Sequence, residues 1–150
     1  MPYDITWEPH GVYKKFWGFV TASEFIQSVG AFHNDPRFDD FLYTINDFLA
    51  VEGFDVSLQT IEYVAALNLG AQAFHPHGWV AAVTTDERIT ALARHFSSPD
   101  LDSYPTEVFA SVAAAREWIG GNIAVPPVTC WTVTSSRPLS VLFLGDAEIR

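Results

Sequence analysis

Cysteine is almost absent from this sequence, in which Cys130 is the single thiol among 150 residues. One thiol excludes an internal disulfide, and Cys130 has no histidine or basic neighbour in sequence that would mark a catalytic thiolate. A chain of this length can bury roughly 68–70% of its unfolded surface, so it needs neither a disulfide nor a metal to fold. The scarcity of cysteine fits a reducing compartment, and we expect a cytoplasmic protein.

Basic residues are also few, because eight Lys and Arg stand against eighteen Asp and Glu and give a formal net charge of −10. Neutralisation of phosphates by basic side chains supplies most of the non-specific affinity for nucleic acids. A chain with this charge repels a phosphate backbone and an anionic membrane surface. We therefore expect no nucleic-acid partner.

Long apolar runs are missing too. No uncharged apolar segment reaches the roughly 18 residues that a membrane-spanning helix needs, so we expect no membrane span. The first residues carry Asp4 and Glu8 where a secretory leader has a basic stretch followed by an apolar one. We expect no signal peptide.

The sequence contains none of the familiar catalytic signatures: no G-x-S-x-G elbow, Walker loop, dinucleotide fingerprint or H-E-x-x-H. His75 and His77 flank a proline, and such a pair binds zinc or nickel only when further ligands are near. No cysteine or carboxylate has a matching spacing, so we interpret them as loop histidines. We expect no cofactor, no metal and no enzymatic activity.

What the sequence does have is 49% apolar and 15% aromatic residues, which indicates one compact domain. Two strand-like runs, YDITWEP and VYKKFWGFVT, flank a His-Gly turn and predict a β-hairpin. Alternation divides the second run into two sets of side chains, one for each face of a sheet: Val12, Lys14, Phe16 and Val20, and Tyr13, Lys15, Trp17 and Phe19. Neither set is cleanly polar, so we expect helices on at least part of both faces.

Helix and strand patterns alternate after the hairpin. Thr21 and Glu24 have the spacing of a capping box and predict a helix that ends before Pro36. FLYTI predicts a short central strand that ends at Asn46-Asp47, followed by a loop containing Gly53. The later segments predict a helix from about residue 57 to Gly70, the strand WVAAV, the helix ERITALARHF, the strand TEVFA and the helix VAAAREWIG.

The predicted order ββαβαβαβα indicates an α/β domain over residues 1–121, with a mixed, mostly parallel sheet and an antiparallel N-terminal hairpin. Residues 122–150 form a C-terminal extension with two apolar runs separated by SSRP. We interpret this extension as an added β-hairpin arm, a swapped arm or a poorly ordered tail. Its apolar content and an exposed hairpin edge favour a homodimer.

Several of these features fall together in one known family. The hairpin with its capped helix, DPRF before the central strand, WVAAVTTDERITALARHF and VFASVAAAREWI together resemble the SpoIIAA-like family. This family is a branch of the STAS fold, which is named after sulfate transporters and anti-sigma factor antagonists. The resemblance covers roughly residues 5–119 and implies a STAS-type α/β domain.

STAS regulators carry Asp-Ser-Ser-Gly at the start of the helix after the central strand, and a partner kinase phosphorylates its second serine. The matching residues here are Asp55-Val56-Ser57-Leu58, where Ser57 takes the place of that serine but valine and leucine replace the other serine and the glycine. Ser57 also suits a plain N-cap. The resemblance implies a non-catalytic binding or regulatory module that engages a protein partner through the strand end and helix start, at Asp47, Asp55 and Ser57.

The alternative is a small apolar ligand. The resemblance extends to lipid-transfer domains, which bind such ligands between the sheet and a mobile helix. The high aromatic content supports this alternative, although the same rings can simply fill a core. The residues that would line such a lipid site, around the strand end and helix start, are Phe48, Leu49, Phe54 and Tyr63.

Overall fold

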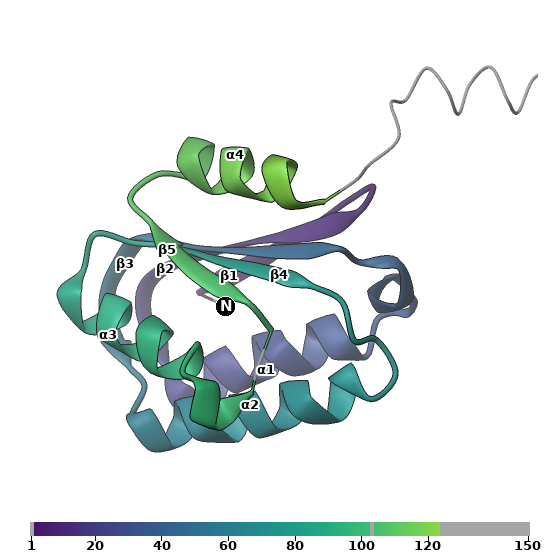
Figure 1. The fold of residues 1–150 in the computed structure, drawn as a ribbon. Coiled ribbons are helices and arrows are strands. Elements are labelled where there is room, and N and C mark those ends of the chain that lie inside the picture. The colour runs from purple at the N-terminus through teal and green to yellow at the C-terminus, as the bar shows by residue number, and fades with distance from the viewer. Residues whose placement is uncertain (1, 103, 124–150) are drawn as a thin grey trace, which may run out of the picture.

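In the computed structural model, which describes residues 2–102 and 104–123, five strands form one sheet and four α-helices cover it (Figure 1). The strands are β1 (Tyr3–Glu8), β2 (Gly11–Thr21), β3 (Tyr43–Asp55), β4 (Trp79–Val83) and β5 (Thr106–Phe109). The helices are α1 (Ala22–His33), α2 (Leu58–Gln72), α3 (Glu87–Phe96) and α4 (Val112–Asn122), with short 3-10 helices at Pro36–Asp40 and Pro99–Leu101. The predicted order ββαβαβαβα is confirmed.

The strand order in the sheet is β1-β2-β3-β4-β5, the same as in the sequence. β1 pairs antiparallel with β2, and the other neighbours are parallel. The connections from β2 to β3, from β3 to β4 and from β4 to β5 therefore all lead in the same direction across the sheet. Because such connections are right-handed, their helices all lie on one face of the sheet. Figure 1 shows α1, α2 and α3 on that face and α4 on the other.

Local sequence signals start the helices as predicted. Thr21 and Glu24 form a complete capping box at α1. Ser57 is the N-cap of α2, where its hydroxyl accepts a hydrogen bond from Thr60 N at 3.1 Å. Asp86 and Ser111 cap α3 and α4 in the same way. These caps satisfy amides that have no partner within the helix.

The main hydrophobic core lies between the sheet and helices α1, α2 and α3. Phe16 of β2 stacks on Phe48 of β3 at a centroid distance of 4.9 Å, and Phe25 of α1 meets Phe54 edge-on at 5.6 Å. A smaller cluster lies under α4, where Ala115 packs among sheet residues. Both faces of the central strands are therefore covered, as the mixed alternation predicts.

The prediction for the central strand is wrong at its C-terminal end. β3 does not stop at Asn46-Asp47 but continues to Asp55, so the expected loop from Asp47 to Ser57 is mostly strand. The long β2 provides the partner, with a register that runs on to Thr21 opposite Asp55. β4 pairs only with Tyr43–Asp47, and the second half of β3 therefore projects beyond β4.

Gly53 suggested a loop because glycine is rare within strands. Here it lies in β3 opposite Phe19, and a Cβ at this position would come within 2.7 Å of the Phe19 ring. The glycine makes room for a cross-strand aromatic ring, and the two register shifts in β2 accommodate the irregular pairing. A close approach of two segments explains this glycine better than a turn does.

Smaller differences concern helix ends. Helix α2 continues past Gly70 to Gln72. Its buried side includes Asn68, whereas Leu69 is 48% exposed. Helix α4 ends at Asn122, one residue beyond the predicted domain boundary. The extension predicted for residues 122–150 lies, from residue 124 onward, outside the described residues. None of the described helices is long and apolar enough to cross a membrane.

Candidate functional site

A pocket lies between the sheet and helices α1, α2 and α3, inside the main core. It is partly open and encloses a cavity of about 80 Å³, several times the 10–15 Å³ that holds one water molecule. Most of its lining is apolar and aromatic, contributed by both the strands and the helices: Phe25, Val29, Phe32, Phe41, Phe48, Phe54, Ile61, Val64, Val80, Ala82, Ile89, Leu92, Ala93, Phe96 and Tyr104. Such a lining is typical of small-molecule sites.

The sheet also contributes polar groups to this pocket. Lys14 of β2 lies opposite Asn46 of β3 in the register, and Thr44 precedes Asn46 by two residues on the same face. The side chains of strand residues two apart point to the same side. Three polar side chains from the two central strands therefore gather on the face that the helices cover.

Two polar atoms of the pocket lining are buried and have no hydrogen-bond partner among the described residues. They are Thr44 Oγ1 and Asn46 Oδ1. A buried polar atom without a partner costs about 1–3 kcal/mol. Unpartnered atoms concentrated at one cavity indicate that something else bonds to them there.

Lys14 is the charged group of this pocket. It is 3% exposed. Lys14 takes part in none of the ion pairs found within residues 2–102 and 104–123. Its Nζ lies 5.4 Å from the Phe32 ring centroid. Burial lowers the pKa of Lys14 to about 7, and burial together with the charge of Lys14 lowers the pKa of His33.

Two of the four residues predicted to line an apolar site do line this pocket. Phe48 and Phe54 are buried and contact the cavity. Leu49 and Tyr63 are not part of the lining, and they are 47% and 53% exposed. Leu49 follows Phe48 on a strand and so points to the opposite face.

The three residues predicted to form a partner-binding edge do not lie together. Asp47 is buried inside β3, where it accepts hydrogen bonds from the Tyr13 hydroxyl and from Leu49 N. Asp55 and Ser57 are exposed at the far end of the same strand. Eight residues of extended chain, roughly 25 Å, separate Asp47 from Asp55. The grouping depended on β3 ending at Asp47, which it does not.

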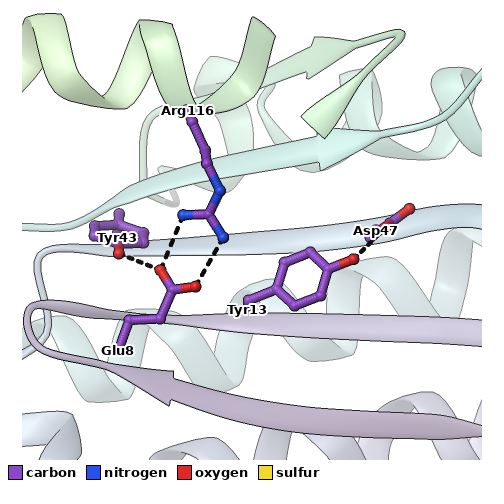
Figure 2. A network of polar contacts seen from close by, with 5 residues as sticks. All are labelled: Glu8, Tyr13, Tyr43, Asp47 and Arg116. Carbon is purple, nitrogen blue, oxygen red and sulfur yellow. Dashed lines mark hydrogen bonds and ion pairs between the residues drawn. The ribbon is translucent and has the colours of Figure 1, made fainter. Parts of the chain in front are cut away.

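A second polar cluster lies on the α4 side of the sheet (Figure 2). Arg116 of α4 makes a bidentate pair with Glu8 of β1, with nitrogen-oxygen distances of 3.0 and 2.7 Å. Tyr43 also donates to Glu8, and beside this pair Tyr13 donates to Asp47. The cluster joins the hairpin of β1 and β2 to β3 and α4, which are distant from it in the sequence.

Several groups of this cluster have shifted pKa values. The hydrogen bond from Arg116 holds the pKa of Glu8 below its usual value. Burial, reinforced by the carboxylate that each one contacts, raises the pKa of Tyr13 and of Tyr43 to about 12. The pair between Arg116 and Glu8 links α4 to the sheet.

His75 has a structural position, since its Nε2 lies 2.7 Å from Phe41 O and its ring packs on Phe41. His77 is exposed nearby. Within residues 2–102 and 104–123, no three His, Cys, Asp or Glu side chains gather closely enough to hold a metal ion.

Sequence reasoning missed Lys14, Thr44 and Asn46 as site residues. A signal was present: Lys14 stands between Val12 and Phe16 in the set of side chains that alternation assigns to one face. A lysine in an apolar stripe is unusual because lysine is almost never fully buried without a partner.

The fold of this protein is similar to that of a solved structure. It is the crystal structure of an uncharacterised protein of the DUF3478 family, with a SpoIIAA-like fold, from Shewanella loihica PV-4. The sequences are 17% identical, and the match covers 78% of this chain and 93% of that chain with a TM-score of 0.51. No protein-family model and no curated protein matches the sequence. At this level of sequence identity, the similarity is evidence for the fold alone. Together with the sheet order, it shows that the protein has the SpoIIAA-like fold that its sequence motifs predict.

Proposed function

We propose that this protein binds a small apolar molecule in the pocket between the sheet and helices α1, α2 and α3. The observation that carries the proposal is a cavity of about 80 Å³ inside an aromatic core. Protein interiors are normally packed with few voids larger than a water molecule. Six phenylalanines belong to the lining of the cavity, and space nevertheless remains among them: Phe25, Phe32, Phe41, Phe48, Phe54 and Phe96.

The first test is the composition of the protein as purified. We expect organic extraction followed by mass spectrometry to release a small apolar compound in an amount close to that of the protein. The complementary measurement is the binding of a neutral apolar fluorophore, N-phenyl-1-naphthylamine, to delipidated protein. An empty preparation that also binds no fluorophore contradicts the proposal.

A matched pair of variants on one helix locates the binding. Ala93 of α3 lines the pocket, whereas Ala91 on the same helix is exposed. Ala93→Phe places a ring toward the cavity, and we expect it to weaken fluorophore binding about tenfold or more, since a filled cavity excludes the ligand. Ala91→Phe should leave binding unchanged. Equal binding by both variants would place the fluorophore elsewhere.

We propose as a second candidate a non-catalytic regulatory module that binds a protein partner. Its support is the ribbon formed by residues 17–21 of β2 and 48–55 of β3, which projects past β4. Trp17, Phe19 and Leu49 are 40%, 62% and 47% exposed on it. In the described part of the chain, this stretch of β3 pairs on one side only, and an unpaired edge can accept a further strand.

Asp55 and Ser57 lie at the end of this ribbon and remain the candidate contact residues of the second candidate. A phosphate on Ser57 would lie at the N-terminus of α2, beside a favourable helix dipole. We expect Ser57→Asp and Phe19→Ser to change which proteins the immobilised full chain retains, compared with Ser57→Ala. Identical retention by all three variants would contradict binding at the ribbon.

A further inference from the structure

The apolar pocket has one charged wall. Lys14 extends from the middle of β2 into the space under the helices, with 3% of its surface exposed. Burying an ammonium group without a counter-charge costs free energy. A buried ammonium group in a natural protein is therefore expected to bond to another group. No carboxylate among the described residues lies within ion-pair distance of Lys14. An anionic ligand would give the charged lysine the partner that it lacks.

The groups around Lys14 suit one small anionic group. Thr44 is buried and Asn46 is half-buried, and the side-chain oxygens of both are buried and lack partners among the described residues. The Thr44 hydroxyl can donate a hydrogen bond, and turning the Asn46 amide over places an N–H donor where its oxygen lies. Together with Lys14, they supply donors from two adjacent strands to one end of the cavity.

The rest of the cavity is mostly apolar, and its other polar lining residues are Asn68 and Thr106. Phe25, Phe48, Phe54 and Leu92 belong to its lining, and the opposite helices add further aliphatic side chains. A ligand that satisfies both parts has one anionic end and one hydrocarbon end. A single lysine matches the single charge of a carboxylate, whereas phosphate usually meets several cations or helix N-termini.

We propose that the pocket binds an amphipathic carboxylic acid, with its carboxylate at Lys14, Thr44 and Asn46 and its hydrocarbon chain among the phenylalanines. This inference rests on the proposed function, because it names the class of molecule that the same pocket takes. Lys14 is the specificity-determining residue: it distinguishes an acid from an alcohol or an ester of equal chain length.

Proton uptake accompanies binding. Burial lowers the pKa of Lys14 to about 7 in the empty pocket, so a fraction of the lysine is neutral at pH 7.5. The carboxylate favours the charged ammonium, and binding therefore draws a proton from solution. His33, which faces Lys14 from α1, has a lowered pKa and is neutral at this pH, as is Asn68 of α2.

The experiment is displacement of N-phenyl-1-naphthylamine from the delipidated full chain by matched short-chain acids, alcohols and methyl esters, from butanoic to octanoic. We expect the acids to bind about tenfold or more tightly than their alcohols and esters, the range of a hydrogen bond to a charged group. Lys14→Met should remove the preference for acids, so that acids and esters of equal chain length bind this variant with equal affinity. Lys15→Met, at the exposed neighbouring position, should retain the preference for acids.

The outcomes separate the two proposals. If acids, alcohols and esters all bind with equal affinity, the pocket binds apolar molecules but the carboxylate assignment is wrong. If nothing displaces the fluorophore, or the fluorophore itself does not bind, the proposed function fails. Calorimetry at pH 7.5 in two buffers of different ionisation enthalpy measures the proton uptake, which should be present in the wild type and absent in Lys14→Met. Uptake by both proteins would overturn the role of Lys14.

Discussion

Lys14 lies on the apolar side of β2 between Val12 and Phe16, and its burial links stability to pH. The pKa of Lys14 is about 7 in the folded protein, and its ordinary value, which applies to the unfolded chain, is 10.5. Between pH 7 and pH 10.5 the unfolded chain therefore binds more protons than the folded protein does. The free energy of unfolding of the ligand-free protein therefore rises with pH across this window. At and below pH 7 it is reduced by the full cost of burying the charged lysine. His33, the titratable group opposite, has its pKa lowered and stays neutral throughout.

The first prediction is that Lys14→Met stabilises the ligand-free protein at pH 7 and that this gain shrinks as the pH approaches 10.5. The difference in pKa corresponds to about 5 kcal/mol as an upper figure. Urea denaturation of both proteins from pH 6 to pH 10 measures it. Lys15→Met is the control and should show no such dependence. A constant difference across the range would contradict the burial of an unpaired ammonium.

The second prediction for single residues concerns two glycines. A Cβ on Gly78 would lie 2.7 Å from Phe41 Cζ and 3.2 Å from Tyr104 Cδ1, and both rings are buried. We expect Gly78→Ala to destabilise the fold by about 1–3 kcal/mol, as overpacking does. Gly30→Ala, in α1 with open space around it, should stabilise by about 0.5–1 kcal/mol. Thermal denaturation ranks the three proteins, and a stabilised Gly78→Ala would contradict the close packing.

At the scale of elements, α4 differs from the other helices. It follows the last strand instead of connecting two strands, so no crossover determines its face. Its position depends on the apolar contacts of Ala115 and Ile119 with the sheet and on the pair between Arg116 and Glu8. The pair joins residues 108 positions apart in the sequence.

The third prediction concerns this pair. The folded pKa of Glu8 is lowered, so the contribution to stability is present above the usual value of 4.5 and is lost as the pH falls through the folded value. Glu8→Gln should cost about 1 kcal/mol at pH 7, since the pair is partly exposed, and much less at pH 3. Hydrogen exchange should show faster opening of α4 than in the control Glu117→Gln. Unchanged exchange in α4 would contradict a docking role.

Strand β3 is the element where pattern reading failed, and the reason is physical. The run FLYTI looks complete because polar Asn46 and Asp47 follow it. These two residues are nevertheless accommodated in the strand, Asn46 toward the pocket and Asp47 toward Tyr13. Their partners come from β2, about thirty residues earlier, and no local pattern contains that information.

At the scale of the whole molecule, the net charge of −10 acts on every folded conformation. Self-repulsion among the carboxylates destabilises the compact state, and salt screens it with a Debye length of about 10 Å at 0.1 M. The fourth prediction is therefore that raising NaCl from about 0.02 M to 0.5 M increases the melting temperature by a few degrees. Scanning calorimetry measures this change. A melting temperature that falls with salt would show that attractive ion pairs outweigh the repulsion.

The homodimer remains a prediction at the same scale. The described edge of β3 beyond Asp47 gives it a structural basis, although Arg88 covers part of that edge by donating to Phe54 O at 2.8 Å. Light scattering of the full chain against a chain that ends at Ile123 tests whether residues 124–150 are needed for association. Two monomers would contradict the dimer.

The order of elements and the helix starts could be predicted from the sequence, because caps and apolar periods depend on residues a few positions apart. Capping by Thr21 and Ser57 is of this kind. The SpoIIAA-like fold is predicted by the resemblance of the sequence motifs to that family. Tertiary structure alone decided the length of β3, the separation of Asp47 from Ser57, and the pocket that joins Lys14 to Asn46. These features arise where segments far apart in the chain meet, and the cavity among the phenylalanines is the space that their packing leaves unfilled.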